Sequence, residues 1–144
     1  MKLIHKIYGT GQPLIIMHGL FGSGDNWRSI ARMMEPHYQS IVVDMRNHGR
    51  SPHDPEMNFQ VMADDILELM TDLKLEKVSL LGHSMGGKVA MQFSFLHPDL
   101  VEKLIVVDIA PKYYPPHHDV VIEAIESIDP KQLTDRMEAE NAMA

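Results

Sequence analysis

The feature that most constrains this chain is a short apolar run that ends in a serine between two glycines. Residues 78–81 are typical of a buried strand, and the sequence then passes through Gly82-His83-Ser84-Met85-Gly86 into a helical pattern. Gly82 and Gly86 lie where a Cβ would crowd a tight turn, so the backbone can hold Ser84 strained with its Oγ exposed. A serine that merely turns the chain is the alternative. The strand before and the helix after favour a nucleophile elbow, with Ser84 as nucleophile.

A second glycine-rich loop follows a different buried strand. The apolar run 13–17 ends in the loop 18–24, and parallel strands bring such loops to the same carboxyl edge of a sheet as the elbow. The helix after the elbow also directs its first N–H groups toward any oxyanion beside the serine. We expect the backbone N–H of Leu20, or alternatively of Phe21, to donate one hydrogen bond to that oxyanion and Met85 to donate the other. The competing interpretation of the loop is an ordinary tight turn.

Strand-like and helical segments alternate along the first 110 residues, which indicates an α/β fold. The expected strands cover 2–8, 13–17, 40–45, 78–81 and 103–108, and the expected helices cover 25–34, 58–73 and 84–97. The first strand is expected at the outside of the sheet. Trp27, Ile30, Ala31 and Met34 are expected on the inner face of the first helix. The alternation predicts a mostly parallel sheet with helices on both faces.

The character of the sequence changes after residue 110. Residues 111–118 form a stiff, proline-broken connection, and two short helical patterns follow at about 120–127 and 130–142. Neither pattern has enough apolar residues for a core of its own. We therefore expect two parts, a core domain over 1–110 and the start of a helical lid or cap over 111–144.

The composition excludes several classes of protein. The 144 residues carry no cysteine, which excludes disulfides, thiolate metal sites and a cysteine nucleophile. The net charge of −7 argues against nucleic acid or an anionic membrane surface as a partner. No apolar run has the length or position of a signal peptide or a membrane span, so a cytoplasmic protein is expected. His117-His118-Asp119 suggests a metal site only weakly, and we expect no metal and no cofactor.

Other polar residues near these loops have structural interpretations. We expect His18 to hold its loop by bonding to the backbone, and His83 to serve packing rather than chemistry. Asp44 and Arg46 end a strand on the same edge and are expected to form an ion pair that braces the loop. Asp64-Asp65 fall in a helical pattern and are expected to be solvated or capping groups.

Two such glycine-rich loops on one sheet are typical of the α/β-hydrolase superfamily, which the chain resembles from Lys2 to about Ala142. Four segments together resemble the YbfF-type bacterial esterases: Phe21-Gly22-Ser23, Asp44-x-Arg46-Asn47-His48-Gly49-x-Ser51-Pro52, Gly82-His83-Ser84-Met85-Gly86-Gly87-Lys88 and Val107-Asp108-Ile109-Ala110-Pro111. The resemblance implies that the acid of the catalytic triad follows the strand after the elbow helix. Asp108 occupies that position. A loop-capping aspartate is the alternative interpretation.

The triad histidine that the resemblance implies has no counterpart in this chain. In the family it follows the last strand in a Gly-x-Gly-His-like setting, which nothing after Ala110 offers. By resemblance roughly a hundred residues are lacking. We therefore expect a C-terminally truncated chain, a fragment of a longer product, in which the strand 103–108 is a bare apolar edge. The alternative is a shortened form that has lost catalysis. His117 and His118 are the conceivable substitutes within the chain.

The sequence thus predicts a serine hydrolase that cleaves small carboxylic esters through an acyl-enzyme intermediate. Ser84 is the nucleophile, and Asp108 orients a histidine from outside this chain. By the same resemblance, the dehalogenases and epoxide hydrolases of the superfamily have an aspartate at the elbow position, so Ser84 argues against both classes. Perhydrolases and carbon–carbon bond hydrolases share the serine and stay open. The alternative from another class is a non-catalytic binding module that keeps the fold.

Overall fold

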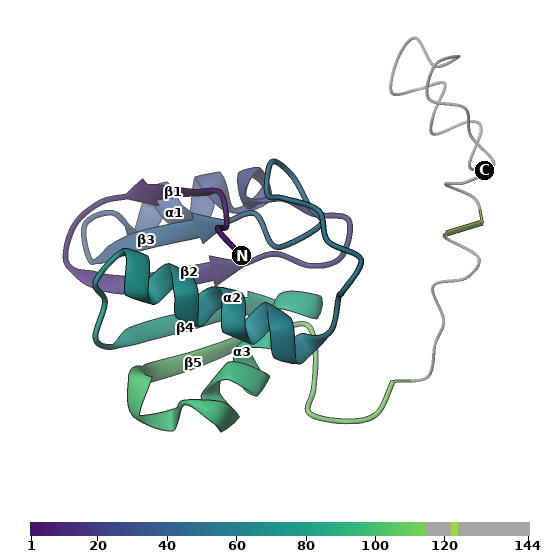
Figure 1. Ribbon diagram of the computed structural model, residues 1–144. Helices are drawn as coiled ribbons and strands as arrows, with labels where there is room; N and C mark the ends of the chain where they lie inside the picture. The colour runs from purple at the N-terminus through teal and green to yellow at the C-terminus, as the bar shows by residue number, and fades with distance from the viewer. Residues whose placement is uncertain (115–121, 124–144) are drawn as a thin grey trace, which may run out of the picture. The chain divides into compact units, whose positions relative to one another are not determined.

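The computed structural model describes residues 1–114 and 122–123. Residues Met1–Pro111 form one compact unit, and within it the described strands build a five-stranded sheet (Figure 1). The strands are β1 (His5–Tyr8), β2 (Gln12–Met17), β3 (Tyr38–Val43), β4 (Val78–His83) and β5 (Val101–Val107). Their order is β1-β3-β2-β4-β5, with β1 antiparallel to β3 and all other pairs parallel. The mostly parallel sheet predicted from the sequence is therefore confirmed.

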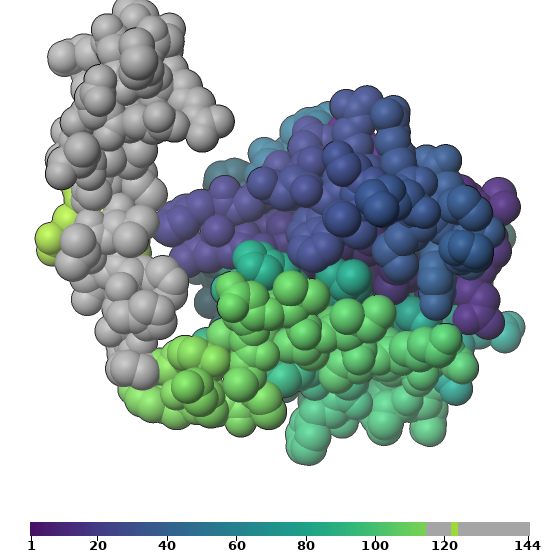
Figure 2. All heavy atoms as spheres, turned by 180° about the vertical axis from the view of Figure 1, so that it is seen from behind, coloured from purple at the N-terminus to yellow at the C-terminus, as the bar shows by residue number. Residues whose placement is uncertain are grey.

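Helices cover both faces of this sheet. The short turn η1 (Gly24–Trp27) and helix α1 (Arg28–Met34) lie on one face, and α2 (Phe59–Asp72) and α3 (Met85–Leu96) lie on the other (Figure 1). Figure 2 shows the α1 face, with residues of about 20–40 in blue. Because side chains alternate along a strand, β2 sends Ile15 and Met17 to the α2 and α3 side and Leu14 and Ile16 to the α1 side. The sheet thus separates two apolar cores.

The ends of the helices follow from local sequence. Asn58 caps α2, because its side-chain oxygen accepts a hydrogen bond from the N–H of Val61 at 2.9 Å. Helix α3 ends at Leu96, and its C-cap His97 lies directly before Pro98, a residue that cannot continue a helix. None of the helices in the described residues is long and apolar enough to cross a membrane.

Some boundaries and faces differ from those expected. Strand β1 begins at His5 rather than residue 2, and the first helix begins with a 3₁₀ turn before α1. Ile30 was expected on the inner face of that helix, yet it is exposed, because α1 is short and only Ala31 is buried. Among the described strands β5 has one neighbour, and its Leu104 and Ile105 are exposed, as predicted for an apolar edge.

The segment after Pro111 belongs to a second unit, Lys112–Ala144. Of this unit the structure describes residues 112–114, where the Lys112 ammonium lies 5.0 Å from the Tyr114 ring centroid, and the helical residues 122–123. The helices expected at 120–127 and 130–142 otherwise fall outside the described residues. The division into core and lid at residue 110 stays a prediction.

Candidate active site

The loops at the carboxyl edge of the sheet hold strained backbone. Within the described part of the chain, four non-glycine residues with positive φ follow the ends of β2 to β5. They are Phe21 (60°), Asn47 (64°), Ser84 (50°) and Asp108 (55°). Such conformations cost free energy and tend to gather at functional sites. The carboxyl edge of the sheet, where the sequence predicts the catalytic loops, is thus also the edge at which these four strained residues lie.

Ser84 lies at the turn between β4 and α3 with φ 50° and ψ −112°. Its backbone N–H donates to the Val107 carbonyl at 3.0 Å, which ties the turn to the end of β5. The side chain is half-exposed, and its Oγ makes no hydrogen bond with any residue that the structure describes. The serine hydroxyl is therefore held at the surface of the edge and is accessible from outside.

The glycines around Ser84 are needed for steric reasons. A Cβ on Gly82 would lie 2.2 Å from the carbonyl oxygen of Gly86, and a Cβ on Gly86 would lie 2.5 Å from the carbonyl oxygen of Met17. Real side chains do not approach backbone atoms so closely. The turn that presents Ser84 is therefore closed to any residue larger than glycine at these two positions.

The loop after β2 packs directly against the elbow. The Gly86 N–H donates to the His18 carbonyl at 3.2 Å, and a Cβ on Gly19 would lie 3.3 Å from Cβ of Ser84. The backbone N–H groups of three residues donate to no acceptor within the described residues: Leu20, Phe21 and Met85. These free donors are what an oxyanion hole requires. Their assignment to an oxyanion hole stays a prediction.

His18 is a buried, neutral brace of this loop. Its Nε2 lies 3.0 Å from the Met45 N–H and must accept from it, so Nδ1 carries the proton and donates to the Gly19 carbonyl at 2.7 Å. Burial lowers the pKa of His18 below its ordinary value, and the neighbouring His48 ring acts in the same direction. Both ring nitrogens are thus occupied by backbone groups, as expected from the sequence.

Asp108 follows β5 beside the elbow. In the parallel pairing of β4 and β5, His83 lies opposite Val107, so Ser84 and Asp108 are the first residues after the two strands. The Asp108 side chain is 85% exposed, and its Oδ2 lies 3.7 Å from Nε2 of His83. The sequence pointed to packing for His83 and did not pair it with Asp108. The register of the two strands is the signal that would have suggested this contact.

The prediction of an ion pair between Asp44 and Arg46 is wrong, because Arg46 pairs with Asp65. Asp44 instead accepts backbone hydrogen bonds, from the Gly24 N–H at 2.7 Å and from the Arg50 N–H at 3.0 Å. Arg46 turns to helix α2, where its Nε lies 2.6 Å from Oδ2 of Asp65 and its Nη2 lies 2.9 Å from Oδ1. Asp44 therefore fixes the shape of two loops without neutralising Arg46.

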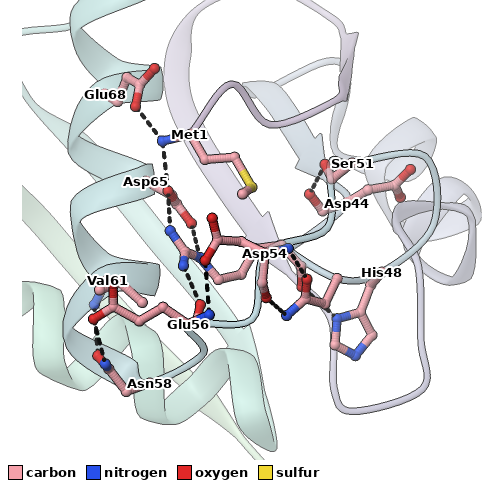
Figure 3. A network of polar contacts seen from close by, with 12 residues as sticks. Met1, Asp44, His48, Ser51, Asp54, Glu56, Asn58, Val61, Asp65 and Glu68 are labelled. Atoms are coloured by element: carbon pink, nitrogen blue, oxygen red, sulfur yellow. Dashed lines mark hydrogen bonds and ion pairs between the residues drawn. The ribbon is translucent and has the colours of Figure 1, made fainter.

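Asp65 is likewise not the solvated or capping group that was expected. Its carboxylate is buried, and it accepts hydrogen bonds from Arg46 and from the Met1 amine, at 2.8 Å (Figure 3). The hydrogen bond to Asp65 raises the pKa of Arg46. Asp64, one position earlier, is exposed and accepts from Gln60, so the expectation holds for that residue.

Residues 1–114 and 122–123 contain no group of three histidine, aspartate or glutamate side chains that could hold a metal ion. His117, His118 and Asp119 lie outside the described residues, so the weak metal suggestion and the role of these histidines as substitutes stay untested. No other feature of the described edge suggests a cofactor.

Comparison with known proteins decides the family. The profile of the family described as alpha/beta hydrolase fold matches residues 12–139. The chain belongs to this family. Among curated hydrolase relatives, "Esterase YbfF" of Escherichia coli (strain K12) is 40% identical over 131 residues, and "sn-1-specific diacylglycerol lipase ABHD11" of Danio rerio is 44% identical over 111 residues. A solved structure, "Marine microorganism esterase", is 47% identical with a TM-score of 0.93.

The chain spans only part of the length of these hydrolases. It covers 52% of the Escherichia coli esterase, 35% of the Danio rerio lipase and 57% of the marine esterase. Conversely, those matches cover 90%, 76% and 99% of this chain. The resemblance to α/β hydrolases of the YbfF esterase type, first seen in four short segments, therefore extends along nearly the whole chain.

Proposed function

We propose that this chain is the nucleophile-bearing part of a serine esterase that cleaves small carboxylic esters through an acyl-enzyme intermediate. The observation that carries the proposal is the conformation of Ser84, which has φ 50° and ψ −112° and an Oγ without a partner among the described residues. A structural serine has no need of such strain, whereas a nucleophile must project from its turn. The esterase and lipase names of the relatives support the same chemistry.

In the proposed reaction, Ser84 Oγ attacks the ester carbonyl carbon and gives its proton to a histidine base. The carbonyl oxygen becomes an oxyanion, which accepts hydrogen bonds from the N–H groups of Leu20 and Met85, with Phe21 as the alternative to Leu20. The ester C–O bond then breaks, and the alcohol leaves with the proton from the histidine. Water, activated by the same histidine, cleaves the acyl-serine and releases the carboxylic acid.

We propose that Asp108 orients this histidine and that the histidine comes from outside residues 1–144. The proposed role of Asp108 is supported by its exposed carboxylate and by the strand register, which places Asp108 beside Ser84. An outside histidine is supported by the lack of any histidine bonded to Ser84 Oγ in the described residues, where His18 is committed to backbone groups. The greater length of the relatives is consistent with it.

The second candidate is a non-catalytic binding module. The lack of a histidine base at Ser84 among the described residues would favour it. Such a module would use the fold without covalent chemistry. The strained turn at Ser84 opposes this candidate, because a binding module has no need of a strained serine turn. Activity measurements separate the two candidates.

The test uses a chimera in which this chain replaces the matching 57% of the marine esterase, so that the rest of the sheet is supplied by a 47% identical protein. We expect hydrolysis of p-nitrophenyl butyrate with a burst of p-nitrophenol. Ser84→Ala should lower kcat by about 10³-fold or more. Ser94→Ala is the matched control, because Ser94 Oγ bonds within α3 to the Ala90 carbonyl at 2.8 Å. Equal activity of both variants would contradict the proposal.

A further inference from the structure

A hollow of about 430 Å³ opens between the loop after β2 and the loop after β3, at the carboxyl edge of the sheet. Residues 20–22 of the first loop and 47–49 of the second line it, and Met57, which precedes α2, completes its described wall. Its volume lies within the range of about 300–1,000 Å³ that is usual for small-molecule sites. Neither Ser84 nor Asp108 lines it, so the proposed ester chemistry does not account for this hollow.

His48 supplies the polar side-chain group of the hollow. Its Nδ1 lies 2.8 Å from the Arg46 carbonyl oxygen, which can only accept, so Nδ1 carries the proton and donates the hydrogen bond. In this tautomer Nε2 has a free lone pair and is a hydrogen-bond acceptor. Figure 3 shows the His48 ring with one nitrogen turned toward the backbone and the other turned away from it.

Nε2 of His48 has no partner among the described residues, although His48 is only 9% exposed. The neighbouring ring of His18, at 5.1 Å between centroids, offers none, because both of its nitrogens are bonded to backbone groups. In the part of the chain that the structure describes, the fully enclosed side-chain atoms without a partner belong to Ser40 and Ser79, so Nε2 of His48 is not enclosed. A nearly buried acceptor is therefore open to a donor that enters the hollow.

The residues on either side of His48 are held in place. The Asn47 side chain bonds both backbone groups of Asp54, with Nδ2 at 2.9 Å from the carbonyl oxygen and Oδ1 at 2.7 Å from the N–H nitrogen. Gly49 has φ 56°, and a Cβ there would lie 2.5 Å from the Asp44 carboxylate. The His48 ring is thus positioned before any ligand binds, which lowers the entropy cost of binding.

The rest of the lining disfavours a charged ligand. None of the described residues that line the hollow is an aspartate, glutamate, lysine or arginine. Phe21 is 57% exposed and Met57 is 40% exposed, so apolar surface beside His48 is open to solvent. An apolar body that covers this surface is stabilised, whereas an ion would lose its hydration without gaining a counter-charge.

We propose that this hollow binds a neutral hydroxyl compound, an alcohol or a phenol with an apolar body. The hydroxyl group donates a hydrogen bond to Nε2 of His48, and the apolar body packs against Phe21 and Met57. A hydroxyl group suits the site because Nε2 can accept a hydrogen bond and cannot donate one. Binding makes and breaks no covalent bond, and it does not require that Ser84 is a nucleophile.

Phenol and anisole, titrated into the 144-residue chain at pH 8, separate the hydrogen bond from apolar contact. Anisole has one more methyl group and no donor, so apolar burial alone would make anisole the tighter ligand, by up to about fourfold. We expect the reverse order, with phenol about twofold to tenfold tighter, because its hydroxyl group bonds to His48. NMR chemical shifts give both dissociation constants. Anisole that binds as tightly as phenol would overturn the proposal.

The nitrogen-15 resonance of His48 Nε2 reports the hydrogen bond itself. Phenol should move this resonance upfield, because an acceptor nitrogen gains a donor, whereas anisole should leave it in place. Through-bond correlations within the ring assign the resonance, so this measurement needs no variant. An Nε2 resonance that does not move at saturating phenol would contradict the proposal.

Two pairs of variants localise the binding. His48→Phe keeps an aromatic ring without the acceptor and should abolish the preference for phenol, whereas His53→Phe should keep it, because His53 is exposed and does not line the hollow. Met57→Ser should weaken phenol and anisole by a similar factor, and Met33→Ser, on α1 outside the hollow, should weaken neither. A preference for phenol that persists in folded His48→Phe would overturn the proposal, as would equal effects of the two methionine variants.

Discussion

Arg46 and Asp65 form a buried bidentate ion pair, in which Nε of Arg46 lies 2.6 Å from Oδ2 of Asp65 and Nη2 lies 2.9 Å from Oδ1. The Arg46 side chain is 8% exposed and that of Asp65 is 1% exposed. The pair joins the loop after β3 to the middle of α2. That loop lies at the carboxyl edge of the sheet, as Ser84 does. The ion pair therefore helps to hold in place the loops at the edge where Ser84 lies.

Removing one member of this pair should be costly. Asp65→Ala leaves the Arg46 guanidinium buried without its counter-charge, so we expect the free energy of unfolding to fall by about 3–5 kcal/mol. Urea denaturation measures the change. The neighbouring Asp64 is the matched control, since it is exposed, and Asp64→Ala should change stability by about 0.5 kcal/mol or less. Similar losses for the two variants would show that the ion pair does not stabilise the fold.

The elbow glycines should differ in their tolerance of a methyl group. In Gly82→Ala the new Cβ meets the backbone of Gly86 and Gly87, which cannot move without opening the turn, so we expect a loss of about 3 kcal/mol or more. In Gly87→Ala the nearest atom, at 2.5 Å, is the Cγ2 of the Ile109 side chain, which can rotate away. A loss of about 1 kcal/mol is expected there. Thermal unfolding of both variants checks the order, and the reverse order would refute the steric account of the elbow.

His18 should make stability depend on pH. Burial lowers its pKa in the folded state, so below about pH 6.5 the unfolded chain binds a proton that the folded chain does not. The free energy of unfolding therefore falls as pH decreases, by at most about 1.4 kcal/mol per pH unit for this group, and the contribution vanishes above pH 7. Urea denaturation at pH 7.5, 6.5 and 5.5 measures the slope.

His18→Asn provides the control for that slope, because the neighbouring Asp44, His48 and His83 are present in both proteins. The variant should be less stable at every pH, since the Met45 N–H loses its acceptor and the Gly19 carbonyl keeps only the hydrogen bond from the Gly22 N–H. Its stability should also depend less steeply on pH between 7.5 and 5.5. Parallel slopes would mean that His18 takes up its proton equally in both states.

The proposed role of Asp108 predicts a loss of activity without a loss of stability. In the chimera, Asp108→Asn should lower kcat by about 10³–10⁴-fold, because an amide no longer holds the histidine in the required tautomer. Its exposure predicts a change in stability within about 0.5 kcal/mol. Asp99→Asn, at an exposed aspartate before β5, should leave kcat unchanged. A stability loss with unchanged kcat would assign Asp108 to loop capping instead.

The parts of the fold that could be predicted are those that depend on residues close together in the sequence. The buried strands are continuous apolar runs, and the elbow needs Gly82 and Gly86 at fixed offsets from Ser84, so both are visible without a structure. His18 was also interpreted correctly, because a histidine directly after a buried strand has backbone groups within reach.

The remaining features depend on how distant segments meet. Arg46 has an acidic residue two positions away in Asp44, yet it pairs with Asp65, because α2 crosses the loop at that point. The contact of His83 with Asp108 depends on the register of β4 and β5. The exposure of Ile30 depends on how α1 packs, and periodicity alone assigned that residue to the core.

Fluorophosphonate labelling, with the modified peptide identified by mass spectrometry, tests the central claim most directly. The account predicts modification of Ser84 in the chimera, loss of the label in Ser84→Ala, and no label on the folded 144-residue chain, whose base lies elsewhere. A label at Ser84 in the 144-residue chain would contradict the outside histidine. A folded chimera that stays unlabelled, while the parent marine esterase is labelled, would contradict Ser84 as the nucleophile.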